Sequence, residues 1–156
     1  MNDSPTRWLS AEEDRAWRSV WSMMTWLPVR LDAQLRADSG ISLAEYNAMS
    51  QISEAPERTI RLSTLAAGAN MTLSHLSRVI SRLEKAGWVV RSPDPDDGRY
   101  TLGTLTDSGW QKVTASAPGH VEAVRRHVFD NLTEAQAHEL GRAVGLISAA
   151  VAPRTS

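Results

Sequence analysis

Six polar side chains are spaced so that they would share one face of a helix, and they form the most chemically informative pattern in the sequence. At about 100° per residue, the opposite face would carry the apolar residues Leu73, Leu76, Val79, Ile80 and Leu83. The polar face would carry Ser74, His75, Ser77, Arg78, Ser81 and Arg82. Hydroxyl, imidazole and guanidinium groups can approach base edges and phosphates, whereas an ordinary solvated face carries paired carboxylates and ammonium groups. The pattern predicts a helix that reads DNA; a plain polar face of an amphipathic helix is the alternative.

The residues on either side of this helix predict how it is positioned. Thr72 can act as its N-cap, which would leave the first N–H groups of the helix close to a phosphate backbone. Upstream, Ser63 is expected to cap a short helix that ends before a turn over residues 68–71. Downstream, Gly87 suits a left-handed C-cap. The sequence therefore predicts a helix-turn-helix.

Two β-rich runs follow, over residues 88–91 and 99–102, and the segment between them is rich in Pro, Asp and Gly. We expect a β-hairpin, or wing, directly after the DNA-reading helix. A third short run, residues 59–62, is a candidate strand that could pair with this hairpin.

Three segments in this order resemble the MarR family of winged helix-turn-helix transcriptional regulators. They are Leu83–Arg91, which follows the pattern LEKxGxVxR, Asp94–Arg99, which follows DPxDxR, and Leu105–Gly109, which follows LTxxG. The resemblance extends over nearly the whole chain, including the flanking helices. It implies a mainly α fold with a small β-hairpin wing and with N- and C-terminal dimerisation helices.

The resemblance also implies roles for individual residues. Ser74, His75, Ser77 and Arg78 would face the major groove, Arg99 would reach the minor groove, and Asp97 would brace it. The full set expected to contact DNA or support the contact is Arg61, Thr72, Ser74, His75, Ser77, Arg78, Arg82, Asp97 and Arg99. Gly98 stands where many members carry a second basic residue, which removes one phosphate-seeking charge from each wing.

Long amphipathic helices are predicted at both ends of the chain, with capping boxes at Ser10 and Thr133. A capping box at Ser42 is expected to start another helix, which precedes the helix-turn-helix. Pro28 should bend the first helix, and Pro118 should bend or interrupt the one after the wing. The apolar faces of these helices exceed what one small module can cover, so we expect a homodimer. The helical dimerisation region would comprise residues 1–40 and 107–156, and the DNA-binding region residues 41–106. A small aromatic or anionic effector, which the resemblance implies, would lie between the two regions, near Trp26, Arg30 and Met49.

Charge and composition restrict the classes of function. The net charge is −1, but residues 58–101 contain seven Lys or Arg against four Asp or Glu, whereas residues 1–57 contain five against nine. Positive charge therefore concentrates where DNA would lie, apart from the acidic wing loop. The absence of cysteine excludes disulfides, thiolate zinc sites and thiol switches. No apolar run approaches the roughly 18 residues of a membrane span, and no signal peptide is evident, so a cytoplasmic location is expected.

Other chemistry finds little support in the sequence. His120, His127 and His138 could be considered for a metal site, but solvated histidines are the preferred interpretation. There is no phosphate loop, nucleophile elbow or carboxylate pair, so we expect neither an enzyme nor a cofactor. The sequence predicts a homodimeric regulator, most simply a repressor, that binds a pseudopalindromic operator and is released by an effector. A winged-helix protein–protein module without sequence-specific DNA binding is the alternative, and a DNA binder without effector is a third hypothesis.

Overall fold

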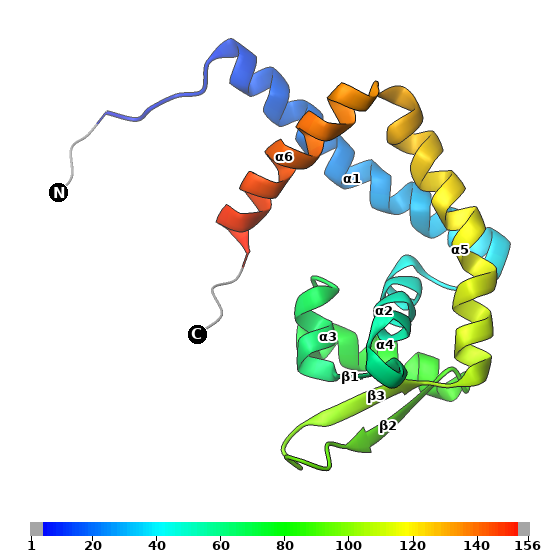
Figure 1. Cartoon of the computed structure of the whole chain (residues 1–156). Coiled ribbons are helices and arrows are strands. Elements are labelled where there is room, and N and C mark those ends of the chain that lie inside the picture. The colour runs from blue at the N-terminus through cyan, green and yellow to red at the C-terminus, as the bar shows by residue number, and fades with distance from the viewer. Residues whose placement is uncertain (1–4, 153–156) are drawn as a thin grey trace.

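Six helices and three short strands make up residues 5–152, the part of the chain that the computed structural model describes (Figure 1). The elements are α1 (Ala11–Ser39), α2 (Leu43–Glu54), the 3-10 turn η1 (Pro56–Arg58), β1 (Thr59–Arg61), α3 (Leu62–Gly68), α4 (Leu73–Lys85), β2 (Val89–Pro93), β3 (Thr101–Leu105), α5 (Asp107–His127), the 3-10 turn η2 (Phe129–Asn131) and α6 (Glu134–Val151). The ends of the two predicted dimerisation segments, residues 1–4 and 153–156, lie outside the described residues.

The sheet is antiparallel with strand order β1-β3-β2, and it confirms both the predicted wing and its short partner strand. Val89 lies opposite Leu105 at the base of the hairpin, and Arg61 lies opposite Leu102 on the other side of β3. The second wing strand begins at Thr101 rather than at the predicted position 99. The predicted Ser63 cap is wrong, because β1 leads directly into α3 and leaves Arg61 in the N-cap position without a side-chain cap.

The predicted DNA-reading helix is α4, and its ends form as expected. The Thr72 hydroxyl accepts a hydrogen bond from the His75 backbone N–H at 3.1 Å. At the other end Gly87 has φ +77°, and the Trp88 and Gly87 N–H groups donate back to the last turn of the helix. This is the left-handed termination that glycine favours. The helix therefore has a defined length and ends at the first wing strand.

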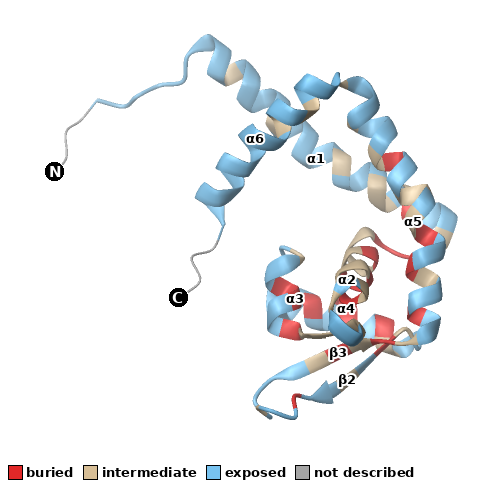
Figure 2. Cartoon of the chain, viewed as in Figure 1, coloured by how far each residue is buried: buried red, intermediate tan, exposed pale blue. Residues whose placement is uncertain are grey.

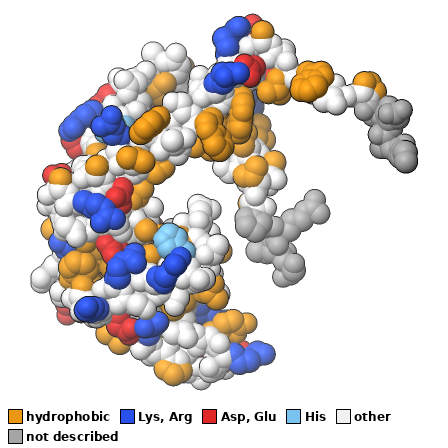
Figure 3. All heavy atoms as spheres, turned by 180° about the vertical axis from the view of Figure 1, so that it is seen from behind, with side chains coloured by type: hydrophobic (Ala, Val, Ile, Leu, Met, Phe, Trp, Pro, Cys, Tyr) orange, Lys and Arg blue, Asp and Glu red, His pale blue; other side chains and the backbone are white. Residues whose placement is uncertain are grey.

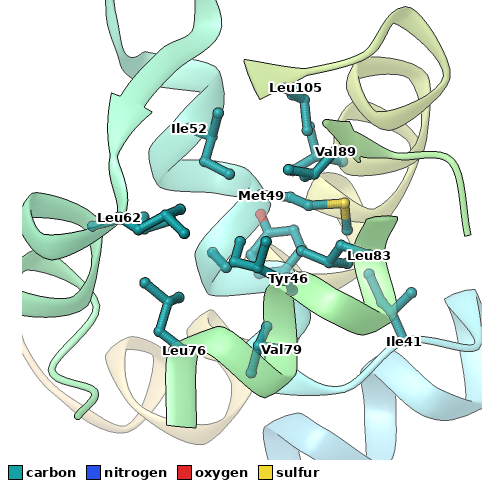
Figure 4. Packing of buried hydrophobic residues seen from close by; sticks show 14 of the residues in the cluster. Ile41, Tyr46, Met49, Ile52, Leu62, Leu76, Val79, Leu83, Val89 and Leu105 are labelled. Carbon is teal, nitrogen blue, oxygen red and sulfur yellow. The ribbon is translucent and has the colours of Figure 1, made fainter. Parts of the chain in front are cut away.

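The apolar side of α4 packs into a core formed by α2, α3, the sheet and the lower half of α5. Figure 4 shows side chains from α2, α3, α4, β2 and β3 converging on one volume. Leu76, Val79, Ile80 and Leu83 have no exposed surface. Leu73 differs from the prediction, because its side chain is 56% exposed. It lies in the first turn of α4 and helps to line a hollow between this helix and the wing.

The lower end of α5 is joined to the base of the wing by close backbone contacts. Thr106 donates from its backbone N–H to the Trp88 carbonyl at 3.0 Å and from its hydroxyl to the Gly87 carbonyl at 2.7 Å. A Cβ atom at Gly109 would lie only 2.1 Å from the Trp88 carbonyl oxygen. Glycine is therefore required at this position, and α5 begins in direct contact with the hairpin.

The long helices begin where the sequence predicts, since all three capping boxes form. Pro118 does not interrupt α5, which is continuous from Asp107 to His127. A proline in a helix removes one backbone hydrogen bond and clashes with the preceding turn, and a bend relieves that clash without ending the helix. Figure 1 shows α5 rising from the sheet and then leaning over toward α1 and α6.

Burial is distributed unevenly between the two ends of the molecule. Figure 2 shows buried residues around α2, α3, α4 and the sheet, whereas α6 and the N-terminal part of α1 are mostly exposed. We call residues 11–30 and 121–151 the helical arm. Its exposed large hydrophobic residues are Trp17, Trp21, Met23, Met24, Trp26, Val29, Val121, Phe129, Val144, Leu146, Ile147 and Val151. Within residues 5–152, no helix is long and apolar enough to cross a membrane.

Candidate nucleic-acid interface

The polar face of α4 points away from the core. Ser74, His75, Ser77 and Arg78 are all exposed, as are Ser81 and Arg82 farther along the helix. The first turn of α4 contains no acidic residue. A helix of 13 residues thus presents hydroxyl, imidazole and guanidinium groups to the outside. These are groups that bind base edges and phosphates in a major groove.

The two arginines on this face differ in their surroundings. Arg82 donates from Nε to the Glu45 carboxylate of α2 at 2.7 Å. Burial alone would raise the pKa of Glu45, but hydrogen bonds from the Ser42 backbone N–H and from Arg82 lower it below its usual value. Arg78 forms no hydrogen bond or ion pair within residues 5–152 and is exposed. Its guanidinium is therefore available for a base edge, whereas that of Arg82 ties α4 to α2.

The wing carries the predicted Arg99–Asp97 pair at its tip. Nη2 of Arg99 lies 2.6 Å from Oδ2 of Asp97, and Nε lies 2.9 Å from Oδ1. The Arg99 side chain is 83% exposed, so the carboxylate fixes its direction without covering it. The hydrogen bonds from Arg99 hold the pKa of Asp97 below its usual value, which keeps the brace charged. This is the geometry that the resemblance implied.

Arg61, which the sequence placed among the DNA contacts, is paired within the protein, although its side chain stays 41% exposed. Its Nε donates to Oδ2 of Asp94 at 2.5 Å, and its guanidinium lies 4.6 Å from the centre of the Tyr100 ring. Asp94 is the first acidic residue of the DPxDxR segment, and its residue surface is only 5% exposed. Sequence reasoning missed its role. An Asp next to Pro within a wing turn was the available signal.

A second ion pair not predicted from the sequence joins α4 to β2. Arg91 donates from Nη2 and Nε to Oε2 of Glu84, at 2.6 and 2.9 Å. These bonds lower the pKa of Glu84. Between α4 and the wing lies a hollow of about 260 Å³, whose lining includes Leu73, Ser77, Arg91, Arg99 and Tyr100. The major-groove face and the wing tip therefore flank one continuous surface.

The three residues expected near an effector do not lie together. Trp26 and Arg30 line one groove of about 760 Å³ between α1 and the ends of α5 and α6. Met49 has no exposed surface and belongs to the hydrophobic core beneath α4. It therefore does not line that groove. Another groove, of about 800 Å³, lies between α1, α2 and the turn before α4, and it extends to His75.

The surroundings of the α5 histidines bear on the metal site considered from the sequence. No group of three metal-binding side chains occurs within residues 5–152. His120 departs from the predicted solvated state, because its ring packs against Tyr46 of α2 with centroids 4.4 Å apart. Burial lowers the pKa of His120, which favours the neutral ring. It therefore helps to pack α5 on α2.

Comparison with solved structures finds close similarity over nearly the full chain. The crystal structure of Sco3205, a MarR family transcriptional regulator from Streptomyces coelicolor in complex with DNA, is 42% identical, with a TM-score of 0.91 over 97% of this chain and 94% of that one. The structure of AbsC, another MarR family transcriptional regulator from the same organism, is 32% identical, with a TM-score of 0.88 over 94% and 98% of the two chains.

Sequence comparisons agree over a shorter region. The model of the MarR family matches residues 41–101. The HTH-type transcriptional repressor IacR of Pseudomonas putida is 30% identical over 86 residues, which are 55% of this chain and 51% of that protein. The matched segment spans about half the length of the curated relatives, or less. These relatives are named as transcriptional regulators and not as enzymes, as the sequence predicted.

Proposed function

Because the chain belongs to the MarR family of transcriptional regulators, we propose that it is a homodimeric, sequence-specific DNA-binding repressor that is released from its operator by a small molecule. The observation that carries the proposal is the exposed, carboxylate-free face of α4 beside a wing whose Arg99 side chain is 83% exposed. A helix for the major groove and an arginine for the minor groove are the two components of winged-helix readout.

Dimerisation is supported by the exposure of the helical arm. None of the residues of α6 is buried. Even its large apolar side chains Leu146, Ile147 and Val151 are each more than half exposed. Figure 3 shows hydrophobic side chains gathered on the surface of the upper, helical part of the molecule. A second copy could cover these side chains by pairing α1, α5 and α6 of both chains. Residues 1–40 and 107–156 would then form the dimerisation region and residues 41–106 the DNA-binding region.

A two-fold dimer would present two copies of α4 to one face of a duplex. Half-sites about one helical turn apart, roughly 34–36 Å, would be bound together. The operator would therefore be pseudopalindromic. Each half-site would be read by Ser74, His75, Ser77 and Arg78. The free backbone N–H groups in the first turn of α4, which follows Thr72, would lie close to a phosphate.

The name of one relative supports repression, and a groove beside α1 supports release from DNA by a small molecule. IacR is named as a transcriptional repressor. A small aromatic or anionic effector in the groove that Trp26 and Arg30 line would bind at the junction of α1 with α5 and α6. Such an effector releases DNA only if it binds more tightly to a dimer whose α4 helices are wrongly spaced.

The experiment that tests the proposal is selection from a random-sequence duplex library with the full-length protein. We expect a pseudopalindromic duplex that is bound far more tightly than a scrambled duplex, with affinity that falls steeply as salt increases. A winged-helix module for protein–protein contact would enrich no sequence. A chain that remains a monomer in sedimentation would also contradict the proposal.

Effector release needs a separate measurement. Small aromatic acids, added to the complex of the protein with its selected duplex, should lower DNA affinity and should bind less well to a Trp26→Ala, Arg30→Ala variant. If no compound of this class releases DNA, the protein is a DNA binder without an effector.

A further inference from the structure

The wing loop of residues 94–99 contains three aspartates, which is unfavourable for a surface that approaches phosphates. Two of them are paired with arginine, Asp94 with Arg61 and Asp97 with Arg99. Asp96 is exposed and forms no ion pair within residues 5–152. The acidic residues of the wing therefore have different surroundings, although the sequence places them side by side.

Asp94 is the most buried of the three, and its residue surface is only 5% exposed. Besides Nε of Arg61, its carboxylate accepts the backbone N–H of Asp96 at 2.9 Å. Its own N–H donates to the Tyr100 carbonyl at 3.0 Å, across the mouth of the loop. The backbone N–H of Asp96, followed by the Arg61 guanidinium, holds the pKa of Asp94 below its usual value despite burial. The side chain of Asp94 thus fixes the start of the loop, and its backbone N–H closes the loop on Tyr100.

Arg61 connects this carboxylate to the residue that precedes the second wing strand. Its guanidinium lies 4.6 Å from the centre of the Tyr100 ring, and the guanidinium of Arg99 lies 6.0 Å from the same ring. Arg61 itself is anchored by β1, which pairs with β3. A continuous set of contacts therefore runs from Asp94 through Arg61 and Tyr100 to Arg99.

We propose that Asp94 is a positioning residue for DNA binding: it holds Arg61 against Tyr100, and this arrangement directs Arg99 toward the minor groove. Arg61 then acts inside the wing and does not serve as a phosphate contact. The inference rests on the proposed function, since Arg99 needs a DNA groove to enter. It also explains why a DNA-binding wing tolerates Asp94, because that charge is buried and paired.

The neighbouring aspartate supplies a matched control. Asp94→Asn and Asp96→Asn remove the same charge two residues apart. If charge alone mattered, both variants would bind the selected duplex as well as the parent or up to about threefold more tightly, because repulsion from phosphates falls. We expect that gain only for Asp96→Asn. Asp94→Asn should bind about tenfold more weakly, since Arg99 is no longer held in its productive direction.

Two further variants separate positioning from a general loss of structure. In an Arg99→Ala background, Asp94→Asn should change affinity by less than about twofold, because the residue through which it acts is absent. Arg61→Lys retains the charge but cannot reproduce the planar contacts with Asp94 and Tyr100. It should weaken binding about as much as Asp94→Asn, whereas a simple phosphate contact would retain nearly full affinity with lysine.

The free protein provides a readout that does not depend on DNA. Hydrogen exchange of the Asp96 and Tyr100 amides, which donate within the loop, should be about tenfold faster in Asp94→Asn and unchanged in Asp96→Asn. If the parent enriches no duplex, the proposed function fails, and the exchange rates still test whether Asp94 orders the wing. If the parent binds and Asp94→Asn behaves like Asp96→Asn in both assays, the inference is wrong.

Discussion

Replacing Arg78 by alanine tests the single base contact that we propose for this residue. Its side chain is exposed and makes no hydrogen bond or ion pair within residues 5–152, so the substitution leaves no acidic partner unpaired. Arg82→Ala, one turn along α4, would instead leave Glu45 without its ion-pair partner, and the Glu45 side chain is only 14% exposed. The effect of Arg78→Ala on binding therefore reports the lost contact with DNA and not a disturbed helix.

The size of the effect follows from the two-fold arrangement proposed above. A bidentate arginine–guanine contact is worth about 1–3 kcal/mol. A dimer with both half-sites occupied loses it twice, or about 2–6 kcal/mol, so the Kd should increase between about 30-fold and about 10⁴-fold. On a duplex with only one intact half-site, the loss should be about half as large in free energy. The stability of the protein should change by less than about 0.5 kcal/mol.

The assay is fluorescence anisotropy with the selected duplex, with variants at each base pair, and with a scrambled duplex. Arg78→Ala should lose discrimination at one position of each half-site, while binding to the scrambled duplex changes little. Equal weakening on every sequence would instead indicate a phosphate contact. If Arg78→Ala binds the selected duplex within about threefold of the parent, the assignment of Arg78 to a base edge is refuted.

Three further predictions concern stability and assembly. Gly109→Ala should lower the free energy of unfolding by at least about 1–3 kcal/mol in urea titrations, because the added methyl group would overlap the Trp88 carbonyl. Burial acts to raise the pKa of Glu45, but its hydrogen bonds outweigh burial and the pKa is lowered. The ionised Glu45 side chain therefore contributes fully to the free energy of unfolding above its usual pKa of about 4.3. That contribution is lost as the pH falls through the lowered pKa of the folded protein. Glu45→Gln should accordingly be less stable than the parent at pH 7, and the difference should shrink toward pH 3. Ile147→Asp should convert the proposed dimer into a monomer in sedimentation velocity, because it places a charge on the exposed apolar face of α6. A dimer that persists in this variant would place the interface elsewhere.

Local signals in the sequence predicted much of the fold. The capping boxes at Ser10, Ser42 and Thr133 and the left-handed Gly87 depend on residues within a few positions of each other, and all of them form. The periodicity of α4 likewise predicted which of its side chains would be buried, except Leu73. That exception arises because the packing of α3 and the wing decides where the core ends. Helical periodicity gives the face on which a residue lies, but not how far neighbouring elements extend over that face.

Features that depend on distant partners were not predicted. Asp94 and Arg61 are 33 positions apart, so nothing local distinguished a buried, paired carboxylate from its exposed neighbour Asp96. Met49 was placed near an effector pocket from the position of its helix, but the rotation of α2 in the assembled fold directs it into the core. The Arg99–Asp97 pair was expected only because the DPxDxR segment resembles the wing of the MarR family, and the ion pair forms as that resemblance implied.

The contacts that join Thr106 and Gly109 to Trp88 couple the lower end of α5 directly to the hairpin. The 21 residues of α5 span about 30 Å at about 1.5 Å per residue. With its lower end clamped, a sideways travel of about 5 Å at the far end equals a tilt of about 10° at the hairpin. A rearrangement of the upper helices that tilts α5 would therefore also change the orientation of the hairpin.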